Sequence, residues 1–468
     1  MDKPFDKILV ANRGEIARRV MRTCKRLGVA TVAVFSDADK ESPHVSEADE
    51  AVRIGPPSAR DSYLNADAIV AAIRATGAQA VHPGYGFLSE RASFARDVRN
   101  AGAVFVGPPP EVLDAFGDKV KAREVATAAS TMPVPGTDGP VAVETARDRI
   151  DAHREAERIG YPVILKAVGG GGGIGMQVVA EAGGLDGALR TCSGRGKAAF
   201  SDPRVYLERY VDEARHIEVQ IFCDGRGAAY ALGERECSLQ RRHQKIIEET
   251  PSPASFLAGK SGGEARRALL EAALRVVRRV GYVGAGTCEF IADARGNMYF
   301  LEVNARLQVE HPVTEMVTGL DLVELQLRVA AGEALPDLSK VVPRGHSIEA
   351  RVCAEDPSKG FLPRPGSIDT LVWAGAPGEP QSSRLRVESG VRAGSQVTPF
   401  YDSMLAKIVV WNETRAGAID DLDRALAGTT IAPCTTNIAF LRDLLASPEF
   451  RDGRYDTRFA EARVAQMT

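Results

Sequence analysis

A predicted β-hairpin that sets two glutamates face to face constrains this chain more than any other feature. Residues 286–291 and 298–304 each read as a strand, and the turn-forming sequence 292–297 joins them. With the turn centred on Arg295 and Gly296, Glu289 pairs directly with Glu302, and their Cβ atoms lie about 5 Å apart. Two such carboxylates repel each other unless a cation lies between them. The hairpin therefore predicts a Mg²⁺ site of the kind that a nucleoside triphosphate needs.

The polar pattern continues beyond this hairpin. From Glu302 to Glu310 every even position is polar, and every odd position from 303 to 309 is apolar. This alternation predicts one extended strand with its polar groups on one face. The strand could be an edge strand with a solvated face or the floor of a catalytic site. The mixture of carboxylate, amide and guanidinium groups favours the catalytic floor.

Arg306 and Glu310 suggest how that floor would work. They share the polar face, and a bend before Pro312 would bring both side chains to one small anion. Arg306 offers a planar fork that suits a carboxylate-like partner. Glu310 is then a candidate base, or alternatively only a salt-bridge partner of Arg306 or Lys245.

A glycine run marks a second candidate site. Residues 163–166 and 176–179 read as strands, and five consecutive glycines at 169–173 lie between them. A Walker loop would end in Gly-Lys-Ser/Thr and open a helix, and neither feature is present. The backbone N–H groups of such a loop can close on a polyanion. Phosphate binding is favoured over a plain surface hairpin because the run follows the strand-borne Lys166.

A second polar cluster spans residues 234–249. Its composition is too rich in charged residues to predict a strand of the hydrophobic core. It fits either a solvated face or a further part of the site, and the residues alone do not separate the two.

The remaining pattern divides the chain. A strand at 7–11, a helix at 15–27 that stops at Gly28 and strands at 30–35 and 78–82 predict a parallel βαβ sheet. The turn at 12–15 has one glycine, whereas dinucleotide binding needs three. A helix opens at residues 117–119, a loop spans 132–140, and residues 332–343 read as a boundary. Beyond it, short strands at 348–353, 385–388 and 405–411 precede closing helices.

Composition excludes several classes of protein. A chain of 468 residues is expected to fold into two to four domains. Its net charge of −3 and its 6% of aromatic residues do not predict a surface that binds nucleic acid. No apolar run is long enough to span a membrane, and no signal peptide is evident. The seven cysteines form no Cys-x-x-Cys pair. We therefore expect reduced thiols in the cytoplasm, with no nucleic-acid or membrane partner.

Together these residues resemble the biotin carboxylases of the ATP-grasp superfamily along nearly the whole chain. The motifs that carry the resemblance are 11–16, 82–90, 117–119, Lys166 with the glycine loop, 240–245, 302–306, 308–315, Arg351 with 354–356, and 401–404. The sequences Gln-Val-Glu-His-Pro at 308–312 and Arg-Arg-His-Gln-Lys at 241–245 are the most specific of them.

The resemblance implies an α/β and α+β fold in three parts. These are an N-terminal parallel βαβ domain (1–116), an ATP-grasp domain (117–335) with a mobile glycine-loop lid at about 135–207, and a C-terminal barrel-like domain (336–468). It also implies two steps that depend on Mg²⁺ or Mn²⁺. ATP phosphorylates bicarbonate to carboxyphosphate, and the released CO₂ then carboxylates biotin held on a carrier.

The resemblance assigns site residues as well. It implies phosphate binding by Lys119, Lys166, Gly171, Gly172 and Gly173; an adenine edge of Glu208, Arg209 and Val211; nucleotide or ribose contacts from His216, Gln240 and His243; metal binding by Glu289, Glu302 and Asn304; a bicarbonate site of Lys245, Arg306, Gln308, Val309 and Glu310; and stabilisation of the biotin enolate by Arg351.

Several alternatives concern the wider enzyme. Ile174 in the glycine loop resembles the urea carboxylase branch, whereas His243 resembles the acyl-CoA and pyruvate branches. An acyl-CoA carboxylase, such as an acetyl-CoA enzyme of fatty acid biosynthesis or a propionyl-CoA enzyme, is favoured. The expected assembly is a homodimer with a separate biotin carboxyl carrier protein and a carboxyltransferase subunit. The rivals are another ATP-grasp ligase and a nucleotide-binding regulatory module without turnover.

Overall fold

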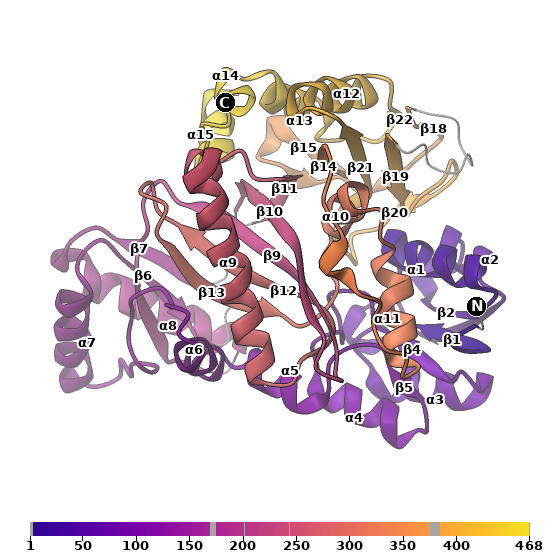
Figure 1. Cartoon of the computed structure of the whole chain (residues 1–468), viewed down its shortest axis with the longest axis horizontal. Coiled ribbons are helices and arrows are strands. Elements are labelled where there is room, and N and C mark those ends of the chain that lie inside the picture. The colour runs from indigo at the N-terminus through magenta and orange to yellow at the C-terminus, as the bar shows by residue number, and fades with distance from the viewer. Residues whose placement is uncertain (1–2, 169–174, 201, 243, 375–383, 468) are drawn as a thin grey trace.

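The computed structural model describes residues 3–168, 175–200, 202–242, 244–374 and 384–467. Three units surround a central sheet (Figure 1): an N-terminal unit in indigo at the right, a small unit around α7 and α8 at the left, and C-terminal helices in yellow at the top. The mixed α/β fold predicted from the sequence is confirmed.

The N-terminal unit is a five-stranded parallel sheet in the order β3-β2-β1-β4-β5. Its helix α1 buries Ile16, Val20 and Cys24 at helical spacing and ends where Gly28 adopts φ 70°. The elements are β1 (Lys7–Val10), α1 (Gly14–Leu27), β2 (Ala30–Ser36), α2 (Pro43–Glu47), β3 (Glu50–Gly55), α3 (Ala66–Thr76), β4 (Ala80–His82), α4 (Ala92–Asn100), β5 (Val104–Phe105) and α5 (Pro110–Gly117).

The small unit holds the predicted strand–loop–strand. Its antiparallel sheet has the order β7-β6-β8, which confirms that strands flank the glycine run. The run itself, with Ile174, lies outside the described residues. The elements are α7 (Ala146–Ile159), β6 (Val163–Ala167), β7 (Met176–Val179), α8 (Leu185–Phe200) and β8 (Val205–Arg209). The helix α6 (Lys119–Ala128) precedes this unit and packs against α5.

The central sheet has eight strands in the order β13-β12-β9-β10-β11-β14-β21-β19, and every neighbouring pair is antiparallel. Its last three strands come from the C-terminal part, so the sheet crosses the predicted boundary at residues 332–343. The strands are β9 (Arg215–Asp224), β10 (Ala229–Arg241), β11 (Gln244–Thr250), β12 (Val283–Ala292), β13 (Met298–Asn304), β14 (His346–Cys353), β19 (Leu385–Ser389) and β21 (Met404–Asn412).

Helices and three small ladders complete the molecule. The ladders pair β15 (Glu355–Asp356) with β16 (Leu362–Pro363), β17 (Gly366–Ser367) with β20 (Gln396–Val397), and β18 (Thr370–Val372) with β22 (Thr430–Ala432). The helices are α9 (Gly259–Arg279), α10 (His311–Thr318), α11 (Leu322–Ala330), α12 (Arg415–Ala427), α13 (Ile438–Ala446), α14 (Pro448–Arg451) and α15 (Phe459–Met467). Among the described residues, no helix combines the length and apolarity that crossing a membrane requires.

The polar cluster at 234–249 corrects one prediction. It forms the hairpin of β10 and β11 in the middle of the central sheet, and most of its charged side chains are buried. A charged sequence can occupy a core strand here because its charges are paired across strands. Arg235, which is fully buried, lies 2.5 Å from Glu218 Oε1 through its Nε.

The β12–β13 hairpin confirms one prediction and refines its cause. Glu289 pairs with Glu302 as expected. Nearer the turn, however, Phe290 pairs with Phe300, one residue away from the register that a turn centred on Arg295 and Gly296 predicts. The register shifts between these pairs, which leaves Leu301 as an extra residue in β13. The bulge therefore sets the two glutamates opposite each other.

The predicted continuous strand to Glu310 is wrong. β13 ends at Asn304, residues 305–310 are irregular, and α10 begins at His311. Pro312 in the first turn of α10 favours a helix start at this point. The chain therefore bends before the proline.

Candidate active site

One cavity of about 760 Å³ collects the predicted site residues. It is lined by residues from the N-terminal unit, the small unit and both halves of the central sheet. His243 and Gly171, Gly172 and Gly173 lie outside the described residues. All the other predicted residues line the cavity: Lys119, Lys166, Glu208, Arg209, Val211, His216, Gln240, Lys245, Glu289, Glu302, Asn304, Arg306, Gln308, Val309, Glu310 and Arg351.

Basic side chains gather at one end of the cavity. Lys166 on β6 and Arg123 on α6 both pair with the Glu208 carboxylate. Burial alone would raise the pKa of Glu208, but the adjacent Lys166 outweighs it and lowers that pKa. Lys119 begins α6 next to the capping residue Asp118, and burial lowers its pKa. This end therefore offers cationic groups to a polyanion.

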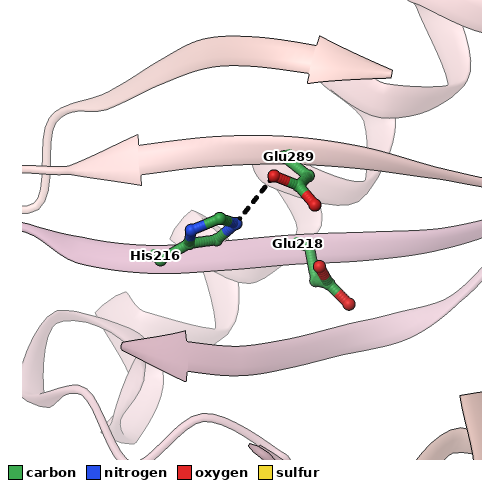
Figure 2. A group of neighbouring side chains, drawn as sticks. All are labelled: His216, Glu218 and Glu289. Carbon is green, nitrogen blue, oxygen red and sulfur yellow. Dashed lines mark ion pairs between the residues drawn. The ribbon is translucent and has the colours of Figure 1, made fainter. Parts of the chain in front are cut away.

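Glu289 forms the centre of a dense hydrogen-bond cluster. Its Oε1 accepts from Asn304 Nδ2 at 2.8 Å, from Gln308 Nε2 at 3.0 Å and from Lys245 Nζ at 2.9 Å. His216 Nε2 lies 2.9 Å from its Oε2 (Figure 2). Although burial opposes ionisation, Lys245 and His216 hold the pKa of Glu289 far below its usual range.

Glu302 behaves differently from its cross-strand partner. Burial and repulsion from Glu289 raise the pKa of Glu302. The two carboxylates with the amide oxygen of Asn304 make an all-oxygen donor set, which Mg²⁺ prefers. The residues present thus fit a divalent cation, because two opposed carboxylates and an amide group offer it oxygen atoms.

Lys245 links several carboxylates at the cavity. Besides Glu289, its Nζ donates to Glu218 Oε2 at 2.6 Å and to Glu310 Oε1 at 2.7 Å. Figure 2 shows Glu218 beside His216 on β9 and Glu289 across from them. One potential metal-ligand atom from each of these three residues lies within 4.8 Å of the other two. However, the Lys245 ammonium already forms ion pairs with both carboxylates. The lysine therefore already supplies a positive charge between the two carboxylates of this cluster.

The bend after β13 brings the polar residues of the stripe together. Arg306 donates to Asn304 Oδ1 at 2.9 Å and to Gln308 Oε1 at 2.8 Å. Its Nε donates to Glu90 Oε2 at 2.9 Å, so the N-terminal unit holds this guanidinium. Glu310, by contrast, pairs with Lys245 and with Arg351 Nη2 at 2.9 Å. Arg306 and Glu310 thus line one cavity while holding different partners.

Comparison with family models covers almost the whole chain. Residues 4–113 match "Biotin carboxylase, N-terminal domain", residues 118–338 match "Carbamoyl-phosphate synthase L chain, ATP binding domain" and residues 349–462 match "Biotin carboxylase C-terminal domain". The biotin carboxylase of Nostoc sp. is 45% identical over 460 residues, which cover 98% of this chain and 99% of that protein. The chain belongs to the biotin carboxylase family. The resemblance inferred from the sequence motifs is confirmed.

Other members of the biotin carboxylase family are longer or have solved structures. The mitochondrial methylcrotonoyl-CoA carboxylase subunit alpha of Oryza sativa is 48% identical over 97% of this chain, which spans 60% of that subunit's length. The biotin carboxylase domain dimer of Hydrogenobacter thermophilus 2-oxoglutarate carboxylase, solved with MgADP and bicarbonate, superposes with a TM-score of 0.91. It is 42% identical, and the match covers 98% of both chains.

Sequence reasoning missed several side chains in this biotin carboxylase site. Glu248 is fully buried on β11 and accepts from Arg351 Nε at 2.6 Å. Glu218 alternates with His216 and Gln220 along β9, so the period-two test applied to residues 302–310 could have found it. Glu248 lies in the polar cluster at 234–249, but that cluster could not identify its partner Arg351, which is more than 100 residues away in the sequence.

Proposed function

We propose that this chain uses ATP and bicarbonate to carboxylate biotin on a carrier protein, through carboxyphosphate. One observation carries the proposal. A single cavity joins Lys119 and Lys166, the opposed pair Glu289 and Glu302, and the cluster from Arg306 to Glu310. Polyanion, cation and small-anion sites thus lie side by side. The solved relative bound to MgADP and bicarbonate supports this assignment.

The proposed roles follow the cavity. Lys119, Lys166 and the glycine loop hold the phosphates of ATP. Glu289, Glu302 and Asn304 hold Mg²⁺ or Mn²⁺, which when bound neutralises charge on those phosphates. The adenine and ribose groups lie along Glu208, Arg209, Val211, His216, Gln240 and His243.

Bicarbonate activation falls to the bent segment. Arg306 offers its fork to the bicarbonate, with Gln308, Val309 and Lys245 around it. Glu310 is ionised, since Lys245 and Arg351 hold its pKa well below the usual range even though burial opposes this. It takes the bicarbonate proton, and the freed oxygen attacks the γ-phosphorus as ADP leaves. Bicarbonate that binds between Glu310 and the cations Lys245 and Arg351 weakens their attraction to the Glu310 carboxylate. The pKa of Glu310 then rises, which makes Glu310 a stronger base.

Carboxyphosphate then breaks down to CO₂ and phosphate. The released phosphate takes the proton from the ureido N–H of biotin, and Arg351 stabilises the enolate that forms. The ureido nitrogen of biotin then attacks CO₂. We assign these tasks to three parts of the chain: residues 1–116, an ATP-grasp part at 117–335 with a lid at about 135–207, and residues 336–468.

The wider enzyme is proposed to be an acyl-CoA carboxylase. The identity with a methylcrotonoyl-CoA carboxylase subunit supports this choice over a urea- or pyruvate-type enzyme. A biotin carrier and a carboxyltransferase are the proposed partners, and the chain is proposed to pair as a homodimer, as the solved relative does. A reducing cytoplasm suits the seven cysteines, all free thiols.

The deciding experiment measures ADP release with and without bicarbonate and free biotin. Turnover that requires bicarbonate and rises with biotin is expected. Turnover that ignores biotin but forms another acyl phosphate or amide product would instead favour a different ATP-grasp ligase. Nucleotide binding without any turnover would favour a regulatory module.

A further inference from the structure

Lys407 is a buried lysine that the resemblance assigns no role. It lies on β21 in the C-terminal part, and its side chain is fully buried. Its Nζ donates to the backbone carbonyl of Val309 at 2.7 Å and lies 3.1 Å from Glu15 Oε1 on α1. One ammonium group thus contacts all three parts of the chain.

Several groups surround this ammonium, including the Glu349 carboxyl on the neighbouring strand β14, which interacts with it electrostatically. Glu15 also accepts from the Tyr85 hydroxyl, and the Lys407 ammonium lies 5.9 Å from the centre of the Tyr85 ring. Glu15 is itself buried. A buried cation is stable only when paired and hydrogen-bonded, and here a carboxylate and a carbonyl both meet the ammonium. The carbonyl it holds belongs to the bent segment of the active site.

The position of that carbonyl matters because the peptide group is planar. The Val309 carbonyl lies in one plane with the N–H and Cα of Glu310. A hydrogen bond to the Val309 oxygen therefore also fixes the position of the Glu310 Cα, from which the side chain extends. The preceding carbonyl, of Gln308, lies 2.7 Å from His311 Nδ1. Two side chains therefore hold two consecutive peptide planes between Gln308 and Glu310. These residues follow the end of β13, where no strand ladder fixes the backbone.

We propose that Lys407 is a positioning residue that holds the 309–310 peptide, and so places Glu310 to take a proton from bicarbonate. This rests on the proposed function. Glu310 loses its charge when it takes the proton, and its attraction to Lys245 and Arg351 then weakens. The backbone contact with Lys407 does not depend on that charge. Lys407 thus keeps the base in place through the step in which its other contacts loosen.

The test replaces Lys407 with methionine, which has similar length and no hydrogen-bond donor. In Lys407→Met we expect kcat for bicarbonate-dependent ADP release to fall at least 10-fold, while the KM for ATP changes less than threefold. A matched control is Arg415→Met. Arg415 is half-buried and forms an ion pair with the buried Glu249 at 2.7 Å, but it does not line the cavity. The control should lose stability and keep kcat within threefold.

A double variant separates positioning from charge pairing. Lys407→Met leaves Glu15 buried without its cation, whereas Lys407→Met with Glu15→Gln removes both charges. If positioning is the role, the double variant regains melting temperature but not kcat. Recovery of wild-type kcat in either variant would overturn the proposal. If the wild-type protein itself shows no bicarbonate-dependent ADP release, the proposed function fails instead.

Discussion

At the scale of single residues, two glutamates that face each other across one hairpin have opposite electrostatics. Four nitrogen groups contact the Glu289 carboxylate, which stays ionised. Burial and repulsion from Glu289 instead raise the pKa of Glu302. The charge of Glu302 therefore depends most on an added cation. This asymmetry makes Glu302 the more informative residue to change.

Glu302→Gln removes one charge from the proposed Mg²⁺ site and keeps the shape of the side chain. Nucleotide turnover is expected to fall about 10²-fold or more. The measurement is ADP release over a Mg²⁺ titration, with the melting temperature as the control for folding. Near wild-type activity at low Mg²⁺ would contradict the role of the hairpin.

Glu310→Gln tests the base. The structure pairs Glu310 with Lys245, so a purely structural role predicts lost stability and retained chemistry. A base predicts that bicarbonate-dependent ADP release disappears while ATP affinity, measured by calorimetry, is unchanged. A variant with more than a tenth of wild-type kcat would have lost at most ~1.4 kcal/mol, which is too little for a general base.

Glu249 predicts a pH dependence of stability. Burial alone would raise its pKa, but hydrogen bonds from His346 and Arg415 outweigh burial and lower the pKa to about 2. Because the folded pKa lies below the unfolded one, this stabilisation is present above about pH 4.5 and is lost as the pH falls towards 2. Glu249→Gln should therefore lower the free energy of unfolding by about 3 kcal/mol at pH 7. The difference from wild type should shrink in urea melts at pH 3, and an equal difference at both values would refute the assignment.

At the scale of elements, the β12–β13 hairpin depends on the glycine in its turn. Gly296 has φ 81°, and a Cβ there would lie 2.8 Å from the Cβ of Phe256. Gly296→Ala should cost about 1–2 kcal/mol for the left-handed backbone and about 1–3 kcal/mol for the clash. Gly281→Ala is the control, because Gly281 has φ 63° and nothing within 4 Å of its added Cβ. Equal melting temperatures for the two variants would argue against the clash.

Elements of regular pattern could be predicted from the sequence, and paired charges could not. Local residue spacing determines the α1 helix, its end at Gly28 and the strands beside the glycine run. That spacing can be read from the sequence alone. The burial of β10 and β11 depends on partners elsewhere, such as Glu218 for Arg235. The bulge at Leu301 was equally invisible, since it depends on how two strands fit rather than on one turn sequence.

At the scale of the whole molecule, the polar site could be predicted as a set of residues but not as an arrangement. The alternation at 302–310 picked out Arg306 and Glu310 correctly as cavity residues, although the strand that it predicts ends at Asn304. Their partners Glu90 and Arg351 come from the N-terminal and C-terminal parts of the chain. Long-range pairing of this kind leaves no periodic signal along the sequence.

The continuous central sheet has a consequence for anyone who divides or recombines this chain. Strands β11 and β14 pair side by side, yet a cut near residue 340 would place them on different fragments. Each fragment would then expose a bare edge of unpaired N–H and C=O groups, a template for aggregation. Chimaeras between relatives should accordingly exchange both strands of this pair together, and the two halves should be produced in the same cell.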